Sequence, residues 1–142
     1  MTIDSSGIVI VAISVAVVGV LLIIVIALTK KAQPQLDVNK YRMKWLAIEK
    51  QLSSDNPASC QMAVMNADKL LDQALKDHRT KGETMGARMK AANDLWSNAN
   101  AIWSAHKVRN RLAHEADTVV GFDEARRTLA SFKQALKDVG AI

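Results

Sequence analysis

The sequence predicts an all-α protein, in which one N-terminal transmembrane helix is followed by an up-and-down bundle of four or five helices. Residues 7–28 form an apolar run without a charged residue. After residue 37, apolar residues recur at spacings of three and four, and no stretch shows the sustained alternation of a β-strand. The 142 residues include only six Gly and two Pro, so long helices fit the chain better than short strands joined by frequent turns.

The apolar run at residues 7–28 is long enough to cross a bilayer, because a helix of this length spans roughly 33 Å. A secretory signal is the alternative, but a signal carries positive charge before a shorter apolar core. Here Asp4 and no Lys or Arg precede the run, and Lys30 and Lys31 follow it. We therefore expect a retained anchor in the cell membrane, with the lipid bilayer as its partner.

The distribution of charge predicts the orientation of this anchor. All 19 Lys and Arg residues lie at or after Lys30, and such residues near a membrane helix resist translocation. We expect residues 1–6 outside the cell and the C-terminal domain in the cytoplasm, where the lone Cys60 would stay reduced. Because 13 of the 14 acidic residues also follow the anchor, this part carries a net charge of +6. That charge could attract anionic lipid or RNA, although a solvated surface is the simpler explanation.

Residues 29–37 read as a polar linker in which Pro34 stops the membrane helix, and residues 38–142 as one helical domain. The first helix of the domain is expected at residues 38–53. Its apolar stripe consists of Tyr41, Trp45, Ile48 and Leu52.

The second helix should begin after Asn56 as N-cap, with Pro57 at its first position, where a missing N–H is harmless. Asp68 and Asp72 lie one turn apart on this helix, beside Lys69, and are expected on a solvated face. The apolar stripe consists of Cys60, Ala63, Val64, Ala67, Leu70, Leu71, Ala74 and Leu75.

Three further helices are expected after a break at Gly82. Thr84 caps a helix at residues 85–96, which should carry Met85, Met89, Ala92 and Leu95 inward, and the sequence leaves open whether the chain bends at residues 96–99. The next helix includes Ile102, Trp103, Val108, Leu112 and Ala113. The last ends at Gly140 and has the most regular stripe: Phe122, Ala125, Leu129, Phe132, Leu136 and Val139.

The stretch HKVRNRLAHE at residues 106–115 gathers side chains of catalytic type. Metal-free cleavage of RNA needs a guanidinium to hold the phosphate, an imidazole to move a proton and an amide to orient either one, and Arg109, His114 and Asn110 supply these groups. RNA brings its own nucleophile, the 2′-hydroxyl. No HExxH pair or phosphate-binding loop occurs, and one Cys with three His cannot assemble a structural zinc site, so we expect no metal or cofactor. The alternative is a solvated polar helix face.

Helix geometry does not bring the three side chains to one point. Asn110 and His114 are about 40° apart around a helix, whereas Arg109 and His114 are about 140° apart. Arg109 would have to curl round, the helix would have to bend or begin there, or a second copy of the domain would have to supply the missing partner. A homodimer is the simplest of these solutions.

The segment RNRLAH, Arg109 to His114, resembles the R-x4-6-H motif of the HEPN superfamily, in the form in which a polar residue follows the Arg. The resemblance covers the helical domain and implies a metal-independent endoribonuclease whose two motifs meet in a homodimer cleft. It implies that His114 is the general acid or base, that Arg109 binds the scissile phosphate and that Asn110 orients the cleft. His106, Lys107 and Arg111 are not motif positions and would add only positive potential.

Other HEPN domains bind RNA without cutting it or act as toxins beside a nucleotidyltransferase antitoxin, and a membrane anchor is not typical of the superfamily. The segments NADKLLDQAL and GETMGARMK also resemble parts of small membrane-anchored bacterial proteins. A second hypothesis is therefore a non-catalytic, membrane-tethered module that binds RNA, a nucleotide or a protein partner.

Overall fold

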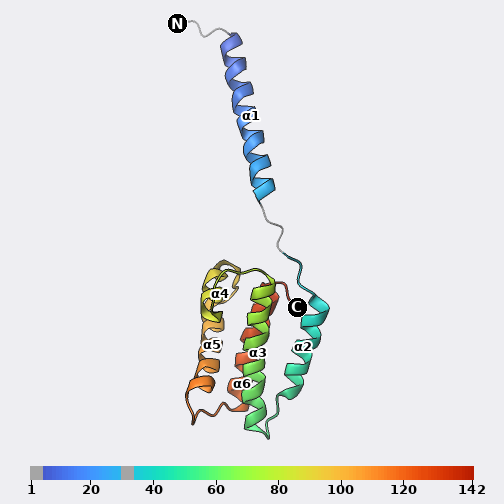
Figure 1. Ribbon diagram of the computed structural model, residues 1–142, viewed down its shortest axis with the longest axis vertical. Helices are drawn as coiled ribbons and strands as arrows, with labels where there is room; N and C mark the ends of the chain where they lie inside the picture. The colour runs from blue at the N-terminus through green and yellow to red at the C-terminus, as the bar shows by residue number, and fades with distance from the viewer. Residues whose placement is uncertain (1–4, 30–33) are drawn as a thin grey trace. The chain divides into compact units, whose positions relative to one another are not determined.

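The computed structural model describes residues 5–29 and 34–142, and within these ranges every regular element is a helix, as the sequence predicts. The chain divides into two compact units, of which the first contains α1 and the second begins at Pro34. The second unit is a bundle in which α2, α3, α5 and α6 run side by side (Figure 1). The expected helical architecture of residues 38–142 is confirmed.

Helix α1, Ser5–Thr29, contains the predicted apolar run. Its segment Gly7–Ala27 is long and apolar enough to cross a membrane by length and composition, and its side chains are exposed. Residues 34–37 have no regular secondary structure, whereas residues 1–4 and 30–33 of the expected N-terminal segment and linker lie outside the described residues.

Helices α2 and α3 form where the sequence predicts them. Helix α2, Val38–Gln51, ends two residues earlier than expected and buries Tyr41, Trp45 and Ile48. Helix α3, Pro57–Asp77, begins at the predicted cap, because Asn56 Oδ1 accepts hydrogen bonds from two backbone N–H groups of the first turn, and it buries its whole predicted stripe. The Tyr41 hydroxyl donates a 2.6 Å hydrogen bond to Asp77, which joins the two helices.

Helix α6, Phe122–Asp138, packs against α3 through the predicted stripe, of which Phe132 and Leu136 are fully buried. The helix ends at Gly140, whose φ of +72° suits glycine. The next N–H, of Ala141, donates to the Leu136 carbonyl at 2.8 Å, while the Gly140 N–H donates to Lys137. This pair of bonds is the Schellman ending, and it closes the helix at the predicted residue.

The expected helix at residues 85–96 is shorter in the structure. Helix α4, Met85–Ala91, has the predicted Thr84 cap but gives way to the 3₁₀ turn η1, Asn93–Leu95, and then to extended backbone at Trp96. The indole N–H of Trp96 donates to the Met89 carbonyl at 2.9 Å, so the chain folds back over α4. Leu95, expected inward, is therefore exposed.

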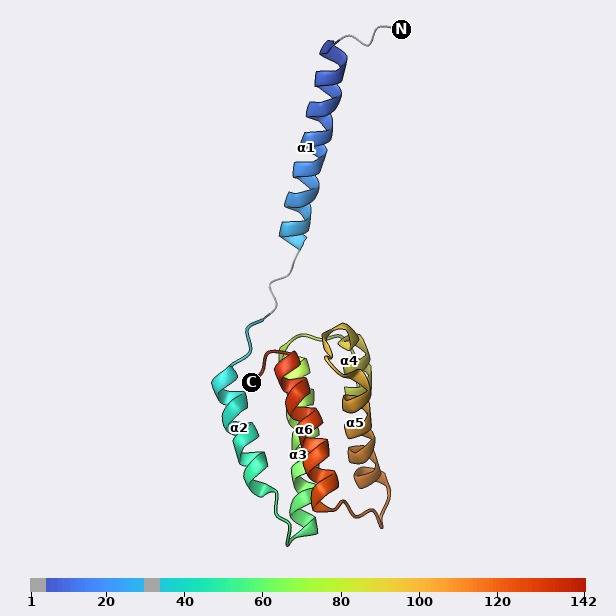
Figure 2. The ribbon, with the colours of Figure 1, turned by 180° about the vertical axis from the view of Figure 1, so that it is seen from behind.

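Helix α5, Ala99–His114, begins after this bend, with Asn98 as its N-cap. Helices α5 and α2 lie on opposite sides of α3 and α6 (Figures 1 and 2). One hydrophobic core, with members from α2 to the C-terminus and none from α1, fills the bundle. Residues 34–142 therefore have a hydrophobic core of their own.

Candidate functional site

The predicted motif occupies the last two turns of α5, which is helical throughout from Ala99 to His114. The helix neither bends nor begins at the motif, so two of the arrangements that could unite Arg109 and His114 are absent. The Arg109 side chain is 32% exposed, Asn110 is half-buried and His114, the last residue of the helix, is exposed.

Arg109 and Asn110 are brought together. Arg109 Nη1 donates a hydrogen bond to Asn110 Oδ1 at 3.0 Å. On its other side, Arg109 Nε lies 3.1 Å from Asp68 Oδ2 of α3, an ion pair by distance although the N–H is not aligned for a hydrogen bond. The guanidinium thus lies between a carboxylate on α3 and the amide beside it on α5, and one-third of the side chain remains open to solvent.

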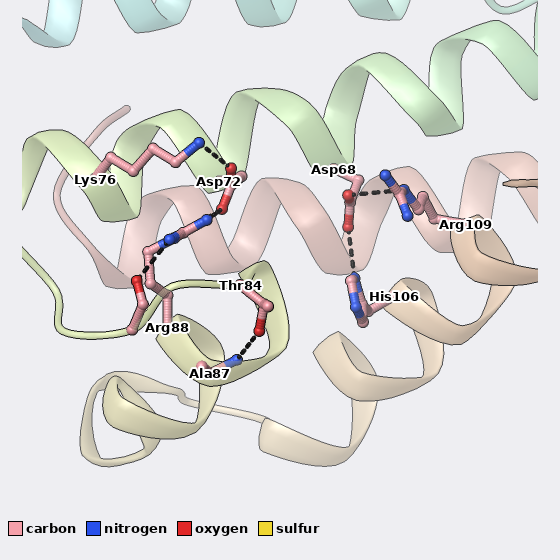
Figure 3. A network of polar contacts seen from close by, with 9 residues as sticks. Asp68, Asp72, Lys76, Thr84, Ala87, Arg88, His106 and Arg109 are labelled. Atoms are coloured by element: carbon pink, nitrogen blue, oxygen red, sulfur yellow. Dashed lines mark hydrogen bonds and ion pairs between the residues drawn. The ribbon is translucent and has the colours of Figure 1, made fainter.

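Asp68 also contacts His106, which lies one turn before Arg109 on the same helix. The Asp68 Oδ1 atom is 2.8 Å from His106 Nδ1, and both residues are buried (Figure 3). The expectation that Asp68 is solvated is wrong, and His106, which was expected only to add positive potential, is buried against Asp68. Asp68 lies within the apolar stripe of α3, four residues after Val64 and three before Leu71, and this spacing was the signal for its burial.

Asp72, one turn further along α3, contacts α4 in a similar way. It accepts a 2.8 Å hydrogen bond from Arg88 Nε and pairs with Lys76 Nζ at 2.7 Å, while Arg88 Nη1 donates to the Gly82 carbonyl (Figure 3). Burial alone would raise the pKa of Asp72, but the hydrogen bonds from Lys76 and Arg88 outweigh it and lower the pKa below its usual value. The expectation of a solvated face is therefore wrong for Asp72 as well.

Gly82 is needed for this second contact. Its φ is +137°, and a Cβ atom there would lie 2.7 Å from the Arg88 backbone nitrogen. The predicted break at Gly82 thus lets the chain turn closely enough for Arg88 to reach both Asp72 and the Gly82 carbonyl.

His114 is separate from these contacts. Its ring forms no hydrogen bond or ion pair with any other described residue, and it lies on the same side of α5 as Asn110, one turn away. Arg111, which is not a motif position, pairs with Glu124 of α6 near the end of α5. The structure thus joins Arg109 to Asn110 and leaves the His114 imidazole open at the helix terminus.

The described part of the chain contains no cluster of three His, Cys, Asp or Glu side chains that could hold a metal ion. The polar groups at the motif are instead the Asp68 carboxylate and its two partners, the His106 imidazole and the Arg109 guanidinium. Such a set can hold an Arg side chain in a fixed orientation toward solvent, where a planar guanidinium is suited to bind phosphate.

The chain matches no protein-family model, no curated protein and no solved structure. These comparisons assign no family, and the resemblance to HEPN domains rests on the sequence of the motif.

Proposed function

We propose that this chain is a membrane-anchored, HEPN-like endoribonuclease that cuts RNA without a metal ion and is active as a homodimer. The observation that carries the proposal is the buried carboxylate behind the motif. Asp68 is 3% exposed and pairs with Arg109, whose side chain is still one-third exposed beside Asn110. A merely solvated helix face needs no buried charge beneath it.

A stability argument explains this carboxylate poorly. Replacing a buried ion pair by apolar residues is often neutral or stabilising, because desolvation of the charges offsets their attraction. The more specific role of Asp68 is to orient Arg109 and α5, as a positioning residue that does not itself touch RNA.

In the proposed reaction the RNA 2′-hydroxyl attacks the adjacent phosphorus, and the bond from phosphorus to the 5′-oxygen breaks. Arg109 binds the phosphate, and His114 either accepts the 2′-hydroxyl proton or protonates the 5′-oxygen. Two copies that face each other across their α5 termini would provide two imidazoles, one for each proton transfer. The products are a 2′,3′-cyclic phosphate and a 5′-hydroxyl.

The test is cleavage of single-stranded RNA by the purified full chain in detergent with a chelator present. We expect cyclic-phosphate products and no cleavage of DNA, which lacks the nucleophile. His114→Ala should lower kcat by about 10²- to 10⁴-fold. His78→Ala, a substitution of the same type at the far end of α3, is the control and should cut normally.

Two further variants separate binding from positioning. Arg109→Lys should be impaired, because a point charge cannot reproduce the two-pronged contact of a guanidinium with phosphate. Asp68→Asn should lower kcat by about 10- to 100-fold through misplacement of Arg109. An inactive wild type, or a His114→Ala variant as active as the wild type, would refute the nuclease.

The proposed homodimer has its own test. Sedimentation of residues 34–142 should show a dimer, and so should the full chain in detergent. His114→Ala at the α5 terminus should leave dimerisation intact, so that loss of activity is assigned to chemistry. A strict monomer at high micromolar concentration in both samples would contradict the arrangement of two motifs in one cleft.

The membrane anchor is tested through its topology. Protease added to intact cells should spare a C-terminal tag and digest it only after lysis, because the positive charges after α1 favour a cytoplasmic domain. Digestion of the tag on intact cells would reverse the proposed orientation, and release of the domain from the membrane fraction would identify α1 as a cleaved signal.

A non-catalytic, membrane-tethered module that binds RNA, a nucleotide or a protein such as an antitoxin is the second candidate. The observation that favours it is the isolation of His114, whose ring forms no hydrogen bond or ion pair with another described residue that could orient it for proton transfer. RNA binding without cleavage, unchanged by His114→Ala, would support this candidate. Toxicity on expression, relieved by His114→Ala, would support the nuclease.

A further inference from the structure

The outward face of α2 combines exposed apolar side chains with positive charge. Two large apolar side chains lie on it without cover, Met43 at 69% and Leu46 at 45% exposure. Around the helix they lie about 60° apart, opposite the buried Tyr41 and Trp45. Lys50 lies between them in projection, and Lys40 and Arg42 border the stripe on either side. We call these five residues the α2 surface.

The charge of the α2 surface is entirely positive. Glu49, the only acidic residue of α2, faces α6 and pairs with Lys133 at 2.6 Å. Arg42 and Lys50 form no ion pair with any other residue that the structure describes. Two identical copies of such a surface would repel each other, so a symmetric contact between two α2 surfaces is disfavoured.

A groove of about 300 Å³ adjoins this surface between α2 and α3. Ala47, Ile48 and Leu70 contribute apolar atoms to it, and Lys44 and Lys69 line it with two further cations. An apolar stripe with cations at its borders and beside a cationic groove fits the interface of a membrane, where aliphatic side chains enter the acyl boundary and cations meet phosphate.

We propose that the α2 surface binds anionic phospholipid head groups and holds the helical domain against the membrane. Thr29 ends α1 and Val38 begins α2 nine positions later, so the tether can extend to at most about 32 Å. A domain anchored by α1 would therefore keep α2 within reach of the bilayer surface. RNA fits this surface less well, because exposed aliphatic side chains offer bases no aromatic platform for stacking.

The inference rests on the proposed membrane anchor for its setting, but its test does not use the anchor. Residues 34–142, which have their own core, are sedimented with vesicles of phosphatidylcholine alone or of equal parts phosphatidylcholine and phosphatidylglycerol. We expect binding to the anionic vesicles, weakened by salt, and little binding to the neutral ones. Failure here leaves the RNA cleavage assay unaffected, so the two proposals fail independently.

The decisive variant is Arg42→Glu with Lys50→Glu. Each cation near an anionic surface changes the partition coefficient by about five-fold, so we expect a loss of about 25-fold or more. Lys90→Glu with Arg127→Glu, on α4 and α6, makes the same change in net charge away from α2 and should bind nearly as the wild type does. Met43→Ser with Leu46→Ser should also weaken binding, although the charge is unchanged.

Circular dichroism checks that each variant is folded, and Arg42→Gln with Lys50→Gln replaces the charge-reversed variant if that one is not. Equal losses in the two charge-reversed variants would overturn the proposal in favour of a net-charge effect. Equal binding to neutral and anionic vesicles would also overturn it. So would loss of single-stranded RNA binding in Arg42→Glu with Lys50→Glu while vesicle binding persists, which would identify the surface as an RNA site.

Discussion

The helices on the two sides of α3 are attached to it by different interactions. Toward α2 and α6, side chains such as Trp45, Leu71 and Phe132 pack in an apolar core, with one hydrogen bond from Tyr41 to Asp77 at the end of α3. Toward α4 and α5, carboxylates on α3 reach across the interface, Asp72 to Arg88 and Asp68 to His106 and Arg109. Helix α5 completes its attachment on α6, where Ile102 and Ala105 are buried.

This difference separates stability from orientation. Apolar packing is non-directional and contributes in proportion to the area removed from water, whereas a hydrogen-bonded carboxylate fixes the position of its partner. The helix that carries Arg109, Asn110 and His114 is attached to α3 in the directional way. We therefore expect the apolar side to dominate the free energy of unfolding and the polar side to determine the geometry of the motif.

The largest effect should come from the apolar side. Phe132→Ala removes a fully buried ring from the packing between α6 and α3, and we expect it to lower the free energy of unfolding by about 3–5 kcal/mol. Urea denaturation of residues 34–142 measures this loss. Phe122→Ala, where the ring is only partly buried, is the control and should cost clearly less. A loss below that of the ion-pair variants would reverse the ranking of the two sides.

The next effect is on the polar side, where Arg88→Met removes the buried partner of an ion pair whose carboxylate, Asp72, is partly buried. Asp72 keeps Lys76, but its carboxylate loses the interhelical contact, and we expect a loss of about 3 kcal/mol. The double variant Arg88→Met with Asp72→Leu should recover most of it, because no uncompensated charge is then left at the interface. Additive losses in the double variant would mean that the pair contributes little and that packing of α4 dominates.

The same contrast explains which features of the fold and of the site the sequence alone could predict. Spacings of three and four predicted α2, α3 and α6, and the local chemistry of Asn56, Thr84 and Gly140 predicted where helices begin and end. These signals are local or periodic. The predicted site residues were located on one helix, but their contacts were not foreseen.

What the sequence did not reveal depends on contacts between distant residues. The pairing of Asp68 with His106 and Arg109 spans about 40 positions, and no periodicity specifies which cation a carboxylate meets. The end of α4 depends on Trp96, whose indole folds back on Met89. The homodimer depends on contacts between two chains, so it stays a prediction.

A third prediction concerns how the free energy of unfolding changes at low pH. Burial would raise the pKa of Asp72, but hydrogen bonds from Lys76 and Arg88 lower it. A carboxyl with a lowered folded-state pKa stabilises the fold above its unfolded pKa, about 3.9, and this contribution disappears as the pH falls through the folded pKa. The difference in unfolding free energy between wild type and Asp72→Asn should therefore be constant from neutral pH to about pH 5 and shrink below about pH 4.

The control for this pH effect is the same substitution in the Arg88→Met background, where only Lys76 still lowers the pKa. The difference should then shrink less over the same range, as measured by urea denaturation at each pH. An equal decline in both backgrounds would show that Arg88 does not contribute to the pKa of Asp72.

The smallest effect should come from the loss of a helix N-cap, and it should not depend on how the helix is attached to its neighbours. Asn56 and Asn98 cap α3 and α5 through the same kind of hydrogen bond, from a backbone N–H to Oδ1 at 3.0 Å. A cap acts within one turn, so each Asn→Ala change should lower the free energy of unfolding by about 1 kcal/mol, both in α3, which belongs to both sides, and in α5, which lies on the polar side. Asn98→Ser keeps an oxygen acceptor and should cost almost nothing. If Asn98→Ala instead cost about as much as Arg88→Met, formation of α5 would limit the attachment of the motif more than the carboxylates of α3 do.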